Sequence, residues 1–114
     1  MYYALTLLGT AALGGLVMAG IRFSGAPRPP TWLAMVHGLL AAAGMTLLIN
    51  AALTVGVPRL AQAGLVVLVL AAIGGAAMHL LYHARQLPLP KPLVIVHALL
   101  AVTGFSMLIV GAQR

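Results

Sequence analysis

The chain has 114 residues, of which 63% are hydrophobic and 5% are charged, with a formal net charge of +6 and a mean hydropathy of +1.15. This composition is typical of integral membrane proteins and lies outside that of soluble globular domains. The chain contains no Asp, no Glu and no Cys. Carboxylate acid–base pairs, carboxylate metal sites, thiolate nucleophiles, iron–sulfur clusters and disulfides are therefore excluded from its side-chain chemistry.

Four apolar stretches are long enough to span a bilayer, which takes roughly 20 residues. They predict membrane helices over residues 2–21, 31–53, 60–82 and 93–111. The first and last pairs are separated by residues 25–30 and 87–92, here called the proline-rich loops, where proline prevents a helix from continuing. The middle connector, residues 54–58, is short. Short connections predict an all-α, up-down-up-down four-helix bundle, and we expect residues 1–114 to form a single transmembrane domain.

The basic residues predict how the bundle is oriented. Four of the six flank the proline-rich loops: Arg22, Arg28, Arg85 and Lys91. Arg59 and Arg114 lie at the opposite end. The positive-inside rule then predicts an integral protein of a bacterial inner membrane, with both proline-rich loops in the cytoplasm and both termini outside. The first stretch lacks a basic leader and a cleavage signature, so we expect it to be retained. The lipid bilayer is the expected partner of the positive charge, and nucleic acid is not.

An internal repeat covers nearly the whole chain. With a shift of 60 residues, residues 33–49 match 93–109 at nine of 17 positions, and 5–18 match 65–78 at seven of 14. The two units, residues 1–54 and 59–114, each contain two helices and should be related by a pseudo-twofold axis along the membrane normal. The repeat places these residues in equivalent positions: Gly14 and Gly74, Gly15 and Gly75, His37 and His97, Gly44 and Gly104.

The two histidines predict a ligand site in the centre of the bundle. A histidine within an apolar membrane helix costs free energy unless its side chain has a partner or binds a ligand. At 1.5 Å per residue, His37 and His97 fall at the same depth as Gly15 and Gly75. Gly44 and Gly104 should lie nearly on the histidine face, about 10 Å deeper. Two imidazoles beside glycines, which have no side chain, predict a narrow site for a flat ligand.

This arrangement resembles the haem core of the membrane b-type cytochromes: cytochrome b and, more loosely, the b561-type proteins. In those proteins one histidine from each of two helices holds a haem, and glycines on the intervening helices make room for the ring. The resemblance implies that His37 and His97 are the metal ligands, with clearance from Gly14, Gly15, Gly74 and Gly75. Cytochrome b has a second histidine about four turns further along each ligand helix. This chain has none there, so a single haem b is implied.

The haem propionates would bring negative charge to a chain without acidic side chains. We expect them to pair with Arg22, Arg28, Arg85 and Lys91. His79 and His83 lie one and two turns beyond Gly75 on the same face and break the repeat. Three interpretations of these two remain open. They are interfacial polar residues near the helix end; or His79 touches a propionate, or lines a quinone or proton path; or His79 is an axial ligand in place of His37 or His97.

Three classes of function remain open. The first is a single-haem b-type cytochrome that carries electrons to or from a quinone or a partner redox subunit, rather than a self-contained enzyme. The second is a non-redox subunit of a larger membrane complex or a homo-oligomer, in which glycines and histidines only pack helices together. The third is chlorophyll binding, with one histidine for each magnesium. An absorption spectrum separates the three.

Overall fold

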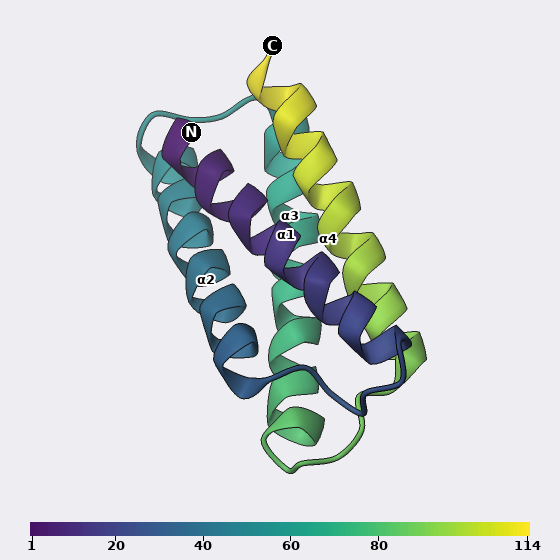
Figure 1. Cartoon of the computed structure of the whole chain (residues 1–114). Helices are drawn as coiled ribbons and strands as arrows, with labels where there is room; N and C mark the ends of the chain where they lie inside the picture. Colours follow the sequence, from purple (N-terminus) through teal and green to yellow (C-terminus); the bar gives the residue numbers. More distant parts are fainter.

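The computed structural model describes all 114 residues, as four long helices and one short π-helical turn. The elements are α1 (Tyr2–Phe23), α2 (Thr31–Thr54), α3 (Arg59–Met78), the π-helix η1 (His79–His83), which continues α3, and α4 (Lys91–Ala112). Helices alternate in direction, so both proline-rich loops lie at one end, and the termini and the α2–α3 connector lie at the other (Figure 1). The predicted all-helical four-helix bundle is confirmed, and its helix ends differ from the predicted ones by no more than two residues.

Proline and glycine set the helix ends locally. Each of α2, α3 and α4 begins directly after a proline, at Pro30, Pro58 and Pro90, whose backbone φ values of −58°, −56° and −62° are already near-helical. After α1 and α2 the chain reverses through Gly25 at φ +117° and Gly56 at φ +80°. These angles lie in the left-handed region, where a side chain is strained. The hairpin topology therefore follows from local sequence.

Glycine brings the two helices of each hairpin into close contact. A Cβ on Gly44 of α2 would lie 2.7 Å from Leu8 Cγ of α1, and a Cβ on Gly104 of α4 would lie 2.9 Å from Leu68 Cγ of α3. Nearby, Leu48 is fully buried in the first hairpin. The same contact recurs at positions related by the sequence repeat, so the repeat is also a repeat of packing. Gly44 and Gly104 serve this helix packing.

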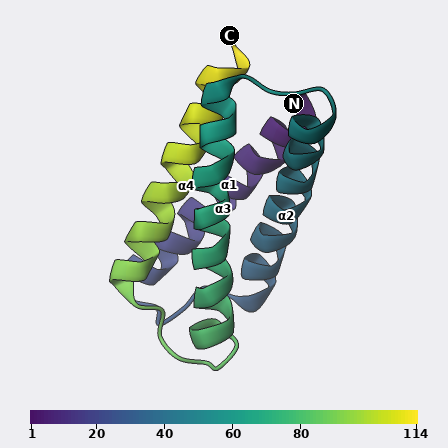
Figure 2. The ribbon, with the colours of Figure 1, turned by 180° about the vertical axis from the view of Figure 1, so that it is seen from behind.

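The two hairpins are joined at the end that carries the proline-rich loops. The Arg22 Nε donates a hydrogen bond of 2.8 Å to the Leu89 carbonyl, and Arg28 donates one of 3.0 Å to the Gln86 carbonyl. The Leu89 amide also donates to the Pro27 carbonyl at 3.0 Å. Seen from behind, α3 lies between α4 and α2 (Figure 2). These hydrogen bonds between the two loops hold the four helices together as one bundle.

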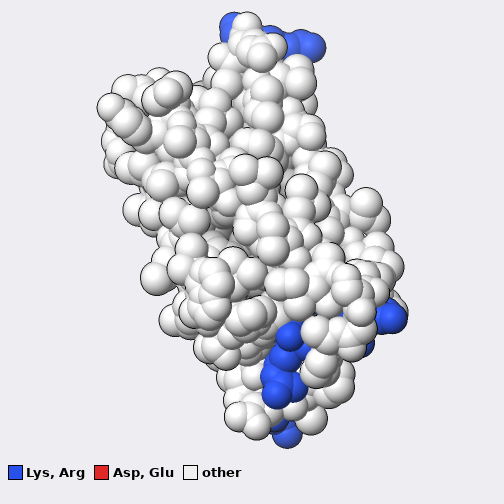
Figure 3. Space-filling view, in the orientation of Figure 1, with Lys and Arg blue, Asp and Glu red and all other residues white.

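The outer surface matches a bilayer. All four helices are long and apolar enough to cross a membrane, with the third span running through η1 as Arg59–His83. Lys and Arg appear only near the two ends of the bundle, and no acidic side chain interrupts the apolar surface between them (Figure 3). The fold is therefore that of an integral membrane protein.

Candidate functional site

Each of the central histidines, His37 and His97, lies over a glycine of the neighbouring helix. A Cβ on Gly15 of α1 would lie 3.0 Å from His37 Cε1, and a Cβ on Gly75 of α3 would lie 2.9 Å from His97 Cε1. Any side chain at either glycine would displace the ring. The predicted placement of Gly15 and Gly75 at the depth of the histidines is therefore found in the structure, with each glycine serving the histidine of its own hairpin.

Backbone carbonyls hold both rings in one tautomer. The His37 Nδ1 lies 2.7 Å from the Ala11 carbonyl oxygen, and the His97 Nδ1 lies 2.8 Å from the Ala71 carbonyl oxygen. Because a carbonyl only accepts, each Nδ1 must carry the hydrogen and donate. The ring nitrogen that could donate a lone pair to a metal is then Nε2. Metal-binding histidines are oriented in this way.

The spacing of the rings fits two ligands of one metal ion. Their centroids are 6.3 Å apart and their planes cross at 80°. A metal–nitrogen bond of about 2.0 Å on each side, with about 1.1 Å from nitrogen to ring centre, separates two such centroids by about 6 Å. The centroid distance is therefore compatible with one metal ion shared by the two rings.

A central cavity of about 860 Å³ surrounds the histidines. This volume is within the range of small-molecule and cofactor sites, roughly 300–1,000 Å³. Most lining residues form pairs related by the repeat, such as Ala12 with Ala72 and Ala41 with Ala101. The walls are mostly apolar, and the small side chains keep the space open. The cavity is thus a pseudo-symmetric apolar chamber with two imidazoles at its centre.

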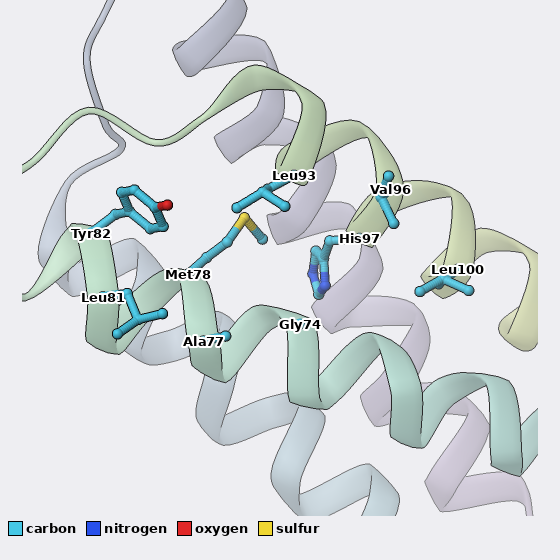
Figure 4. Close-up of a pocket in the computed structure, with 9 residues that line it drawn as sticks. All are labelled: Gly74, Ala77, Met78, Leu81, Tyr82, Leu93, Val96, His97 and Leu100. Atoms are coloured by element: carbon cyan, nitrogen blue, oxygen red, sulfur yellow. The ribbon is translucent and has the colours of Figure 1, made fainter.

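The other predicted glycines lie outside this chamber. A Cβ on Gly14 would come only to 4.0 Å of His37 Cβ, and one on Gly74 would meet nothing within 4 Å. Gly74 instead lines a second, smaller pocket of about 160 Å³ between α3 and α4. Figure 4 shows His97 reaching from α4 across this pocket toward α3. Gly44 and Gly104 belong to the hairpin packing and do not line the central cavity.

The predicted cationic residues separate into two groups. Arg22 lines the central cavity near the loops, and its guanidinium donates only to the Leu89 and Ala26 carbonyls. The other three, Arg28, Arg85 and Lys91, do not line it. The Lys91 Nζ instead lies 5.6 Å from the centre of the Phe23 ring. One predicted arginine is therefore placed to meet an anionic group in the cavity.

His79 and His83 form a second polar group at the loop end of the cavity. Their rings stack with centroids 5.2 Å apart and planes inclined by 23°. Both line the cavity. His83 is 6% exposed, and its Nε2 lies 3.3 Å from Thr31 Oγ1 on α2. Both belong to η1, where the α3 backbone widens into a π-turn, a distortion common at functional sites.

Sequence reasoning missed the roles of Ala11 and Ala71, whose carbonyls accept from the histidines. Each alanine lies 26 residues before its histidine. An Ala-Ala pair is identical in the two repeats at this point, a signal that could have drawn attention to it. The role belongs to the backbone, however, and only the relative rotation of the helices reveals it.

The centre of the site brings two histidines together as candidate metal ligands. No group of three or more His, Cys, Asp or Glu side chains comes together anywhere in the chain. A metal held by the central histidines would need its remaining coordination positions filled by something other than this protein, as a macrocycle does. A comparison with known protein families, curated proteins and solved structures finds no match for this chain, so its function is inferred from these residues and their geometry.

Proposed function

We propose that this chain is a membrane-embedded single-haem b-type cytochrome, with His37 and His97 as the two axial ligands, which passes electrons to or from a quinone or a partner redox subunit. The observation that carries the proposal is the 6.3 Å separation of two imidazole rings whose Nδ1 groups are both engaged by carbonyls. When bound, a haem would supply a one-electron carrier.

The residues present fit this group. A haem would be held by ligands from the protein, and this chain offers the imidazoles of His37 and His97 within one cavity. Gly15 and Gly75 give the rings their space, and the apolar walls exclude water. Arg22 lies at the loop end of the cavity, where it would meet carboxylates. Ligation would also relieve the cost of two polar rings in hydrocarbon.

The convergence of the rings favours haem over chlorophyll. In the chlorophyll alternative each histidine takes its own magnesium, so the two rings need not approach one another. Here the ring centroids are 6.3 Å apart, close to the separation that two ligands of one metal would have. The non-redox assembly subunit has no comparable observation in its favour, and it becomes an outcome of the test below.

The orientation and the membrane are part of the proposal. We place both proline-rich loops, and with them the end of the cavity lined by Arg22, in the cytoplasm of a bacterial cell. The support is the four-to-two division of basic residues between the two ends of the bundle.

The deciding experiment is an absorption spectrum of the protein purified from haem-replete cells, oxidised and then reduced with dithionite. We expect one haem per chain with a low-spin, six-coordinate spectrum. His37→Ala and His97→Ala should each abolish that spectrum or leave a weakened high-spin species. Val36→Ala changes a neighbour of His37 that does not line the cavity and serves as the matched control.

His79→Ala separates the two ligand assignments. Low-spin ligation should survive this change, with at most a shifted reduction potential. A colourless protein would contradict the haem assignment and favour the assembly subunit. Loss of haem on His79→Ala, with full occupancy in His97→Ala, would move the ligand to His79.

A further inference from the structure

The central cavity departs from its pseudo-symmetry on one side. Five exposed apolar residues extend it between α2 and α3: Met35, Leu39, Val69, Ile73 and Leu80. None of the positions related to them by the repeat lines the cavity. The α2 and α3 helices also contact one another less than α1 and α4 do. The cavity therefore opens sideways toward the lipid through this set of residues, here called the lateral mouth.

The lateral mouth has polar side chains only at its loop end. His79 and His83 replace Ala19 and Phe23 of the first repeat, and Thr31, the first residue of α2, lies beside His83. These side chains thus reach the cavity where α2 and α3 meet. Polar residues at membrane depth are costly and are found where a ligand or a pathway uses them. A mouth with apolar walls and hydrogen-bonding side chains at one end suits an amphiphile that arrives from the bilayer.

We propose that the lateral mouth binds the head group of a lipid-soluble quinone, with a ring carbonyl oxygen accepting a hydrogen bond from His79 and the isoprenoid tail leaving between α2 and α3. The choice of a quinone over an ordinary lipid rests on the proposed electron-transfer function. His79 is four residues beyond Gly75, about 6 Å along the helix, so the head group would lie close to the central histidines. A single haem near one side of the membrane needs such a mobile partner.

Tryptophan fluorescence can report on binding at this site. Trp32 is its only tryptophan and follows Thr31 directly, beside the polar end of the mouth. Quinones quench tryptophan fluorescence at short range. The full chain in lipid nanodiscs, as purified, is titrated with a short-chain benzoquinone and a short-chain naphthoquinone. We expect saturable quenching by at least one of them.

Variants that restore the symmetry of the repeat test the contact. The double change His79→Ala with His83→Phe introduces the residues of the first repeat and should weaken the apparent affinity by roughly tenfold or more. Ile73→Phe should narrow the mouth and weaken binding as well. Its repeat equivalent Leu13 is similarly exposed, 66% against 62% for Ile73, and does not line the cavity. Leu13→Phe is therefore the matched control and should bind as the unchanged protein does.

A second readout does not depend on fluorescence. A photoreactive azidoquinone should label α3 and η1 near Ile73 and His79, and excess unlabelled quinone should prevent the labelling. Quenching that never saturates and is equal in all variants would overturn the quinone site even if the protein binds haem. Azidoquinone labelling that excess unlabelled quinone does not prevent would also overturn it, in favour of an ordinary lipid site. Saturable, His79-dependent binding to a colourless protein would support the quinone site while the haem assignment fails.

Discussion

A histidine within a membrane helix must have its polar atoms satisfied, and the two central histidines meet that need in the same way. Each Nδ1 donates to an alanine carbonyl of the neighbouring helix, and no buried side-chain nitrogen or oxygen is left without a partner. An imidazole that only packed would be satisfied at this point. What exceeds packing is that the two rings lie with their centroids only 6.3 Å apart in an open cavity.

Two adjacent glycines on α3, Gly74 and Gly75, allow a test of whether glycine is needed to make room for the histidine ring or only for helix packing. Gly75→Ala places a methyl group 2.9 Å from His97 Cε1, so the ring must turn or withdraw, whereas Gly74→Ala meets nothing within 4 Å. We expect Gly75→Ala to lower haem occupancy strongly while the far-UV circular dichroism stays helical, because overpacking at the ring is not easily relieved. Gly74→Ala should keep full occupancy. Equal occupancy in the two variants would reduce Gly75 to an ordinary packing residue.

At the scale of the element, the helices pair through glycine because a bilayer gives apolar helices no hydrophobic reason to associate. Close backbone approach and van der Waals contact replace that driving force. Gly64 of α3 and Gly104 of α4 face each other, and a Cβ on Gly64 would lie 2.8 Å from the Gly104 carbonyl oxygen. The neighbour is backbone and cannot turn away. The α3 and α4 backbones are therefore in direct contact at this level.

A pair of alanine substitutions tests this packing. Gly64→Ala should destabilise the bundle by about 1–3 kcal/mol, because the helices must separate to admit the methyl group. Gly20→Ala, in α1 with nothing within 4 Å, should be neutral or stabilise by about 0.5–1 kcal/mol through its better helix propensity. Unfolding in mixed micelles with increasing SDS, followed by circular dichroism, measures both. A Gly64→Ala variant as stable as Gly20→Ala would contradict the close approach.

At the scale of the whole molecule, the two ends of the bundle differ in charge and in structure. One end carries four basic residues and two proline-rich loops that are tied together by arginine-to-carbonyl hydrogen bonds. The other carries two basic residues and a short connector. The asymmetric polar group of His79 and His83 lies at the first end, so any electron or proton exchange at that group would take place on one side of the membrane.

Cysteine labelling tests the proposed orientation, in which both proline-rich loops face the cytoplasm. The chain has no native cysteine that would interfere. Val55→Cys in the α2–α3 connector is 83% exposed and should react with a membrane-impermeant maleimide in intact cells. Ser24→Cys beside the first proline-rich loop should react only after the membrane is permeabilised. The reverse pattern would invert the topology and place the loop end of the cavity outside.

The number, length and order of the helices were determined by the sequence itself. Proline stops, glycine reversals and apolar length are local properties, and helix rise converts them directly into depth. The 60-residue repeat added what local signals lack, since it predicted that Gly15 with His37 and Gly75 with His97 would lie at one level.

Only the tertiary structure decided which way each helix faces. These helices are apolar on all sides, so the sequence has no hydrophobic stripe from which the buried face of each helix could be predicted. Gly44 and Gly104 therefore looked like site residues although they pack against Leu8 and Leu68. The carbonyl partners of the histidines, the π-turn and the lateral mouth depend on helix rotation and on the spacing between hairpins. These are set by contacts between residues far apart in the chain, which apolar composition alone does not encode.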